Sequence, residues 1–291
     1  MDLLYCFKIE DPSGEFEPGT ELLDALFLDY SSFYERESRR IWHTVYASTR
    51  EEADSLRDKV VAMSDEWKEL GVDFETGDVF ELHKSEWADA WKKYFTPVEI
   101  SDNLLINPAW MPPAPKAGQK VLSIDTGMSF GTGQHPTTFY CLKKIDQFAS
   151  GGGAMLDAGC GSGILAAAAA LLGYDVVDAF DFDPEAVRMS AENFTLNKVS
   201  EKIGLSVGDA GVYPGRAEKY DLVCANILGH LLITFRFNIV KWLKPDAHLV
   251  LAGILEKDFD RVSDAFAEAG LVELERETIR EWTGGVFRLA K

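Results

Sequence analysis

The 291-residue sequence contains no run of 18 apolar residues and no apolar segment at its start of the kind that marks a secretory signal. We therefore expect neither a membrane span nor export, and we predict a cytoplasmic protein. Cysteine is scarce: Cys6, Cys141, Cys160 and Cys224 are scattered, without a CxxC pair. Such spacing favours buried reduced thiols over a disulfide framework. The five histidines are equally dispersed, so we predict no metal site.

Basic residues are also few. The chain has 29 Lys and Arg against 48 Asp and Glu, which gives a net charge of −19. A large phosphate-binding surface is therefore disfavoured, and we expect no direct binding of nucleic acid. The excess of acids has two readings, because it can keep the protein soluble or attract a basic partner. Composition leaves both open.

Length and a 46% hydrophobic content indicate two domains, each with its own core. Residues 1–82 show the order β-α-β-β-α-β, which is the ferredoxin-like arrangement. Residues 83–112 are predicted to be a linker. Trp87, Trp91 and Phe95 recur there at four-residue spacing, typical of an amphipathic helix that docks on a neighbouring domain. A cluster of prolines ends this segment.

Residues 113–291 alternate apolar strand patterns with helix patterns, which predicts a doubly wound, mostly parallel sheet. The last two strand patterns, VELERETIREW and GGVFRLAK, meet at Thr283-Gly284-Gly285. We expect them to pair as a hairpin around that connection, with one strand antiparallel to the rest. The domain is thus predicted to hold seven strands.

The segment MLDAGCGSGILAAAAALLGYDVVDAFDF has a glycine-rich turn between a strand and a helix. Gly159 and Gly161 let the backbone turn tightly and approach a ligand, and Asp181 follows at the spacing of an acid that binds ribose hydroxyls. A dinucleotide fingerprint needs a third glycine where Ile164 stands, which counts against NAD and FAD. The observed GxGxG, preceded by Asp157, resembles the first motif of class I S-adenosylmethionine (SAM) dependent methyltransferases. A turn that only connects elements is the alternative.

Two further polar residues follow predicted strands, where ligands of such sheets bind. Asp209 can accept a hydrogen bond from an adenine amino group, or it can be a solvated turn acid. Asn226, in CANILGHLL, can bind the methionine part of the cofactor or orient an incoming amine. As asparagine also caps helices, a capping role is the alternative.

Upstream lies FGTGQHPTT, in which Pro136, Thr137 and Thr138 are predicted to start a helix whose free N–H groups can hold a carboxylate. Together with DAGCGSGILA and ANIL, this segment resembles the ribosomal protein methyltransferases of the PrmA type, which methylate the large-subunit stalk-base protein. The linker and domain order match as well. The resemblance covers nearly the whole chain and is weak before residue 83.

The resemblance implies a class I SAM-dependent methyltransferase with a Rossmann-like seven-stranded sheet and an N-terminal ferredoxin-like substrate-recognition domain. It implies methyl transfer from SAM to amino nitrogens of a large-subunit ribosomal protein, at lysine side chains, with an N-terminal amine as a further candidate. Its cofactor contacts fall on Thr138, Gly159, Asp181 and Asn226. Phe130, Gly131 and His135 match its cover over the site, where His135 is either structural or a proton acceptor. Asp157, Gly161 and Asp209 complete the predicted cofactor residues.

The chain departs from the family pattern at two places. DTGMSFGTG stands where the family commonly has DPGLAFGTG, and Gly229-His230 replaces the usual Ala-Gly after ANIL. We expect both changes to border the substrate. They leave cofactor binding intact and leave the exact methyl acceptor open.

Three alternatives remain. The first is a related protein-lysine or small-molecule methyltransferase with another acceptor. The second is a non-catalytic adaptor that kept the fold. The third, an NAD-dependent oxidoreductase, is opposed by Ile164 and by the lack of a hydride-transfer constellation.

Overall fold

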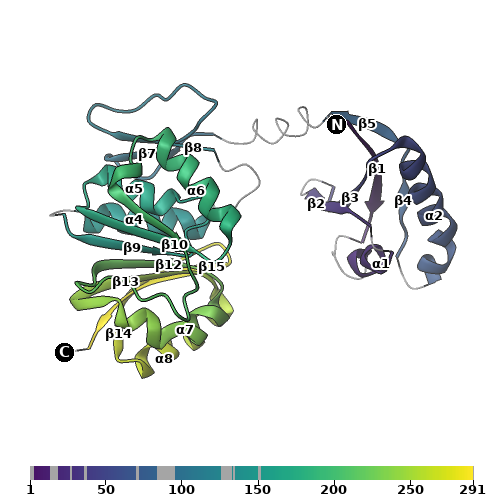
Figure 1. The fold of residues 1–291 in the computed structure, drawn as a ribbon. Helices are drawn as coiled ribbons and strands as arrows, with labels where there is room; N and C mark the ends of the chain where they lie inside the picture. The colour runs from purple at the N-terminus through teal and green to yellow at the C-terminus, as the bar shows by residue number, and fades with distance from the viewer. Residues whose placement is uncertain are drawn as a thin grey trace. The chain divides into compact units, whose positions relative to one another are not determined.

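A computed structural model of the chain describes residues 3–13, 19–26, 28–35, 38–69, 72–83, 96–125, 133, 135–149 and 152–290. Contacts divide it into an N-terminal unit, Met1–Tyr94, and a C-terminal unit, Phe95–Lys291. Figure 1 shows the elements of both units.

The N-terminal unit is an antiparallel sheet with two helices. Its elements are β1 (Leu3–Asp11), α1 (Gly19–Ala25), β2 (Tyr30–Glu35), β3 (Arg40–Ala47), α2 (Arg50–Glu69), β4 (Glu75–Thr76) and β5 (Phe80–His83). The sheet order is β2-β3-β1-β4, and β5 also pairs with β1. Phe7 and Ile9 of β1 pack against Leu23 of α1 and against Val60 and Trp67 of α2. This is the predicted ferredoxin-like order, with the last strand broken into two short pieces.

The C-terminal unit begins with a short three-stranded sheet and continues as a long α/β segment. Its strands and helices are β6 (Val98–Glu99), β7 (Leu104–Pro108), β8 (Lys120–Ile124), α4 (Pro136–Phe148), β9 (Ala154–Ala158), α5 (Ile164–Leu172), β10 (Val176–Asp181), α6 (Pro184–Leu196), η2 (Ser200–Lys202), β11 (Ile203–Val207), β12 (Tyr220–Asn226), α7 (Gly229–Lys241), β13 (Leu243–Leu255), α8 (Glu256–Glu268), β14 (Leu271–Ile279) and β15 (Trp282–Leu289).

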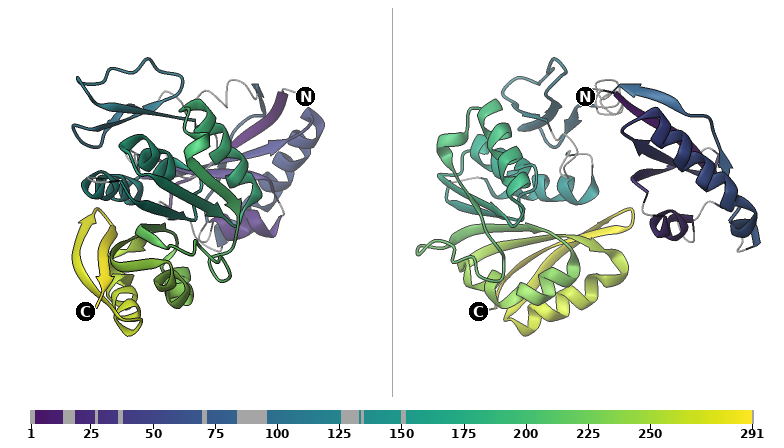
Figure 2. Two further views of the ribbon diagram at one scale, coloured as in Figure 1. Left: turned by 60° about the vertical axis from the view of Figure 1, so that its left-hand side comes forward. Right: turned by 45° about the vertical axis from the view of Figure 1, so that its right-hand side comes forward.

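Seven of these strands form one sheet in the order β11-β10-β9-β12-β13-β15-β14. The strands from β11 to β13 run parallel, and β15 is antiparallel to both of its neighbours. Helices α4, α5 and α6 cover one face, and α7 and α8 cover the other (Figures 1 and 2). The predicted doubly wound sheet, closed by an antiparallel hairpin, is therefore confirmed, with the topology of class I methyltransferases.

Part of the region predicted as a linker, 83–112, forms strands β6 and β7 of the C-terminal unit. β7 pairs with β6 and with β8, and all five of its residues are buried. Leu104 and Ile106 join Leu122 and Ile124 in the core under α4 and α5. The division at residues 94 and 95 thus replaces the expected boundary at 112 and 113, because burying these side chains ties the segment to the larger core. The predicted amphipathic helix lies outside the described residues.

The final hairpin turns at Arg280 and Glu281, not at the predicted Thr-Gly-Gly connection. Gly284 and Gly285 instead lie inside β15. A Cβ on Gly284 would collide with the Tyr140 ring, and one on Gly285 would lie 2.6 Å from Cζ of Phe259. These glycines make room for aromatic rings on both faces, a role that a turn signal in the sequence does not reveal.

Among the described residues, no helix is long and apolar enough to cross a membrane. In the same part of the chain, no group of three or more His, Cys, Asp or Glu side chains is arranged to hold a metal ion. All four cysteines are buried free thiols. Burial raises the pKa of each thiol, so the sulfurs are held in the neutral form.

Candidate cofactor and active site

A cavity of about 410 Å³ lies at the carboxyl ends of β9, β10 and β12. These strands are parallel neighbours, so their ends meet at one edge of the sheet. The structure brings five predicted residues to its lining: Gly159, Gly161, Asp181, Asp209 and Asn226. Ligands of open parallel sheets bind at this edge.

The glycine-rich turn follows β9 and is fastened to the neighbouring strand. The N–H groups of Gly159 and Cys160 both donate to the Phe180 carbonyl, at 2.9 and 3.0 Å. Gly159 has φ +80°, and a Cβ there would lie 2.5 Å from Cγ2 of Ile227. Both the backbone conformation and the space therefore require glycine, which leaves bare backbone facing the cavity.

Asp181 ends β10 and links the turn to the next helix. Its Oδ2 accepts a hydrogen bond from Gly161 N at 2.9 Å, and its Oδ1 accepts one from Asp183 N at 3.1 Å. The residue is only 7% exposed. A carboxylate offers about four acceptor sites, so about two remain for hydroxyl groups of a ligand in the cavity.

Asp157 does not line the cavity, in contrast to its predicted contact with the cofactor. It is fully buried beneath the turn, and its Oδ2 accepts a hydrogen bond from Ala166 N at 3.1 Å. Gly163, the N-cap of α5, has no side chain to cap the helix, so Asp157 supplies that acceptor from the strand. Burial raises the pKa of Asp157 to about 7. Its place in the fold is that of a support for the turn and the first turn of α5.

Asn226 ends β12 at the border of the cavity. Its Nδ2 lies 3.5 Å from Oγ1 of Thr138, a buried residue of α4. Its Oδ1 is buried and has no hydrogen-bond partner among the described residues. A buried acceptor without a partner is costly in free energy, and here it borders the space where a ligand would supply the donor. The capping alternative finds no support, because Leu228 is the N-cap of α7.

The rest of the lining is largely apolar and was not predicted. Phe182, which directly follows Asp181, is 75% exposed, and Leu231 and Phe235 face the cavity from α7. The four-residue spacing of the last two, on the helix after a strand-end asparagine, is a signal that could have identified them. Asp209 is occupied in part, because its Oδ1 accepts a hydrogen bond from Gly211 N at 2.6 Å.

The segment before α4 is described only in part, and the predicted Phe130 and Gly131 lie outside the described residues. His135 is the N-cap of α4, and its Nδ1 lies 2.8 Å from Oγ1 of Thr137. Its ring packs edge-on against Trp282, with the ring centroids 5.0 Å apart. Burial lowers its pKa. These contacts support the structural reading of His135.

Comparison with known proteins agrees with the family resemblance seen in the sequence. A family model described as ribosomal protein L11 methyltransferase (PrmA) matches residues 20–289. A ribosomal protein L11 methyltransferase of Streptococcus pyogenes serotype M4 (strain MGAS10750) is 37% identical over 240 residues, which are 80% of this chain and 75% of that protein. Its counterpart in serotype M28 (strain MGAS6180) is 36% identical over the same shares.

A solved structure supports the same grouping. The crystal structure of ribosomal protein L11 methylase from Lactobacillus delbrueckii subsp. bulgaricus superposes with a TM-score of 0.63 at 27% identity, covering 68% of this chain and all of that one. The family match spans both units. The chain therefore belongs to the ribosomal protein L11 methyltransferase (PrmA) family.

Proposed function

We propose that this protein transfers methyl groups from SAM to amino nitrogens of ribosomal protein L11, at lysine side chains, with the N-terminal amine as a further candidate. The observation that carries the proposal is the cavity at the carboxyl edge of the sheet. It gathers Gly159, Gly161, Asp181, Asp209 and Asn226 in a chain that belongs to the family. We further propose that the protein works in the cytoplasm.

The cavity fits the proposed cofactor. Its volume of about 410 Å³ lies within the roughly 300–1,000 Å³ of small-molecule sites. Asp181 keeps acceptor sites for two ribose hydroxyls, and the bare backbone at Gly159 admits the ligand closely. Phe182 and Phe235 give an adenine ring apolar surface, and Asp209 in the same lining offers a carboxylate that can accept a hydrogen bond from its amino group.

The bound sulfonium supplies an already activated methyl group, so the protein chiefly has to align the acceptor. Asn226 Oδ1 is placed to accept an N–H of the incoming amine and hold its lone pair toward the cavity. Among the described residues that line the cavity, the titratable groups are Asp181 and Asp209, and both bind backbone N–H groups. We therefore assign no general base.

A lysine acceptor must lose its proton first. With a reference pKa of about 10.4, the neutral amine at pH 7 costs about 4 to 5 kcal/mol. An apolar cavity lowers this cost because it disfavours the ammonium form. At saturating acceptor, kcat should then rise about tenfold per pH unit below the pKa of the bound amine.

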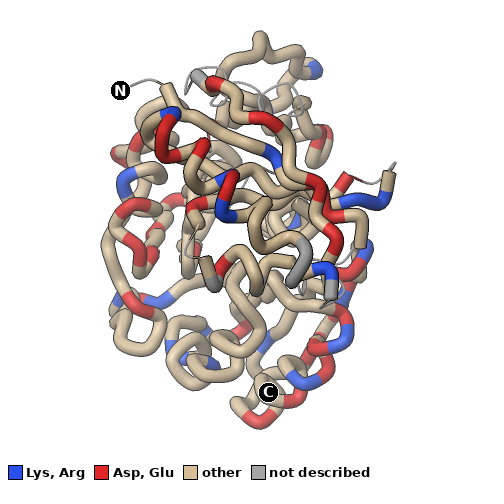
Figure 3. Tube along the Cα trace, turned by 90° about the vertical axis from the view of Figure 1, so that its right-hand side faces the viewer, with Lys and Arg blue, Asp and Glu red and all other residues tan. Residues whose placement is uncertain are grey.

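We propose that the N-terminal unit recruits the acceptor. Residues 1–82 hold 21 acidic against 8 basic residues, and acidic positions recur over much of the chain in Figure 3. On the sheet face away from the helices, Phe33 lies opposite Trp42 and is 65% exposed. An acidic unit with an exposed aromatic residue suits a basic ribosomal protein, which it would attract at long range.

The function is tested with purified ribosomal protein L11 and labelled SAM, followed by mass spectrometry of the product. We expect label on lysine residues of L11. A parallel assay on a whole-cell lysate shows whether another protein is preferred, which would identify a different acceptor. Absence of SAM binding in calorimetry would support the non-catalytic adaptor.

Deletion of residues 1–82 should abolish methylation of L11 while SAM affinity survives, and full activity without this unit would contradict recruitment.

A further inference from the structure

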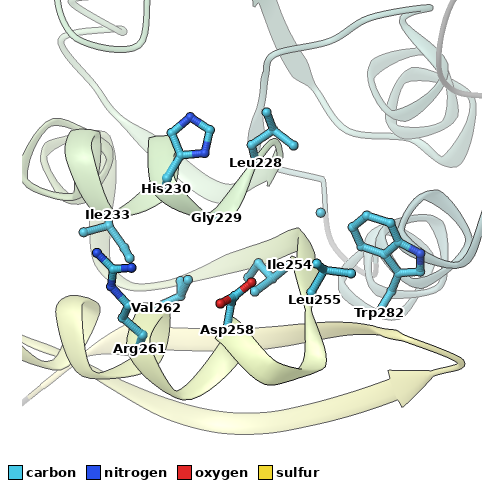
Figure 4. A pocket seen from close by; sticks show the side chains of 11 residues that line it. Leu228, Gly229, His230, Ile233, Ile254, Leu255, Asp258, Arg261, Val262 and Trp282 are labelled. Atoms are coloured by element: carbon cyan, nitrogen blue, oxygen red, sulfur yellow. The ribbon is translucent and has the colours of Figure 1, made fainter. Parts of the chain in front are cut away.

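A second cavity, of about 260 Å³, is lined by residues at the carboxyl end of β13, on the same edge of the sheet as the cofactor cavity; Figure 4 shows its lining. It lies between the start of α7, the end of β13, the start of α8 and Trp282. The cofactor site does not account for it. Engineered apolar cavities of roughly 150 Å³ bind ligands the size of benzene, so this one has room for an aliphatic side chain.

Two routes connect this cavity to the methyl-transfer site. Asn226 and Ile227 line the cofactor cavity, and the next two residues, Leu228 and Gly229, line the second. Three residues of chain span at most about 11 Å. On the other side Trp282 forms one wall and packs against His135, the cap of the helix that carries Thr138. A bound protein segment can thus present its amine at the cofactor cavity while a neighbouring side chain enters the second cavity.

The chemistry of the lining indicates the occupant. Ile254 and Val262 are fully buried and form the floor, and Leu228, which is 57% exposed, and Trp282 form walls. Charged Asp258 and Arg261 are exposed and belong to the rim. Burial of an aliphatic group gains free energy on such a floor, whereas a polar rim suits the N–H and C=O groups of a peptide backbone.

The cavity is also where this chain departs from its family pattern. Gly229 and His230 stand in place of the usual Ala-Gly, and both line the cavity. A Cβ on Gly229 would lie 3.4 Å from Cγ2 of Val262 and 3.7 Å from Cγ2 of Ile254, in ordinary contact with the floor. The glycine therefore deepens the cavity by one methyl group, and His230 adds an exposed polar group.

We propose that this cavity, here named the acceptor pocket, binds an aliphatic side chain of the acceptor protein close to the methylated amine. The span from Asn226 to Gly229 corresponds to at most about three residues of extended chain, which limits the distance along the acceptor. Leucine, isoleucine, valine and methionine are the side chains that fit. The proposal rests on the proposed function and names the specificity element of that same site.

The test fills the pocket from Gly229, the first residue of α7. Because glycine is unfavourable in a helix, Gly229→Leu should not weaken the helix, and its side chain would occupy the space above Val262 and Ile254. We expect the KM for L11 to rise at least about tenfold, with kcat at saturation and the Kd for SAM within about twofold of wild type. Thr234→Leu places the same side chain on an exposed position of α7 and should leave all three values unchanged.

The acceptor side gives an independent measurement with the wild-type enzyme. Each aliphatic residue of L11 within three positions of a methylated amine is changed to Asp. One such change should raise KM in wild type and have no further effect with Gly229→Leu, because the two variants remove the same contact.

The outcomes separate the two proposals. An unchanged KM for Gly229→Leu, or a parallel loss of SAM affinity, overturns the acceptor pocket while methylation of L11 by wild type upholds the function. If wild type leaves L11 unmethylated, the proposed function is wrong, and the same two variants are assayed with the protein that the lysate assay labels.

Discussion

The two cavities at the carboxyl edge of the sheet differ in the parts of the chain that shape them. The cofactor cavity is shaped by turns at the ends of parallel strands, where Gly159 and Asp181 are held by backbone hydrogen bonds. The acceptor pocket is shaped by side chains of two helices and a strand, with Ile254 and Val262 as its floor. The first therefore has little freedom to vary without loss of its turn. The second can change depth or polarity at a position such as Gly229 with little strain.

This difference predicts separable functions for neighbouring cavities. Changes in the first should alter SAM affinity and leave the KM for the acceptor, whereas changes in the second should do the reverse. Asn226 borders the cofactor cavity three residues before Gly229, and it is where the separation can fail.

The largest effect is expected at Asp181. Asp181→Ala removes the carboxylate that we propose binds two ribose hydroxyls, and charge-assisted hydrogen bonds contribute roughly 1.5–3 kcal/mol each. SAM affinity measured by calorimetry should fall about a hundredfold. Asp181→Asn, which keeps the shape and one acceptor oxygen, should lose less. Glu201→Ala removes an exposed acid of η2 and serves as the control. Unchanged affinity for Asp181→Ala would remove this residue from the site.

Asn226→Ala should have the next largest effect, and it tests the residue that lies between the cofactor cavity and the acceptor pocket. Loss of the buried Oδ1 should leave the acceptor amine without its partner, at a cost of about 2 kcal/mol. We expect kcat to fall about thirtyfold, with a smaller change in the Kd for SAM. Thr138→Val keeps the size of the neighbour 3.5 Å away and measures how much that contact positions the amide. A loss of SAM affinity with kcat at saturating SAM unchanged would show that Asn226 serves the cofactor alone.

Phe182→Ala should have a smaller effect, because an exposed ring contributes mainly one apolar wall. Removing it should weaken SAM binding about tenfold and leave the KM for L11 near wild type. Phe33 provides a matched control, since it is exposed to a similar degree, 65% against 75%, and belongs to the other unit. Phe33→Ala should keep SAM affinity and raise the KM for L11. A reversed pattern would contradict the roles proposed for both units.

The parts of this molecule that could be predicted are those in which the local backbone conformation or strand position allows only a few residue types. The turn at Gly159 and the strand-end Asp181 could be located by spacing because few other residues satisfy those positions. The apolar segment Leu104–Pro108 resembled a linker, since its neighbours are prolines and its burial depends on partners far along the chain. Gly284 and Gly285 resembled a turn for a similar reason, because the rings that require them come from α4 and α8.

The acceptor pocket could not be predicted from the sequence because its apolar residues look like ordinary core. Ile254 of β13 and Val262 of α8 are typical apolar residues of a strand and a helix that pack together, and both do belong to the core. Only the assembled fold reveals that the contact between them is incomplete beside Gly229. The sequence did single out Gly229 and His230 as departures from the family that border the substrate, but it did not show that they line a cavity.

The smallest effect is expected for a change at Asp157, and it is an effect on the stability of the fold. The folded-state pKa of this residue is about 7, well above the ordinary value of about 3.9, so the folded protein binds the proton more tightly than the unfolded chain. Its contribution to stability therefore falls as pH rises toward and through 7. Between pH 6 and 8 the loss is on the order of 1 kcal/mol, or about 2–4 °C in Tm.

Asp157→Asn keeps an oxygen for Ala166 N and removes the titration. The Tm of the variant minus that of wild type should become more positive from pH 6 to pH 8. His43, His135 and His248, whose pKa values burial lowers, titrate in both proteins and cancel in this difference. Parallel Tm profiles would show that Asp157 contributes no pH-dependent stability between pH 6 and 8, and would contradict a pKa of about 7 in the folded protein.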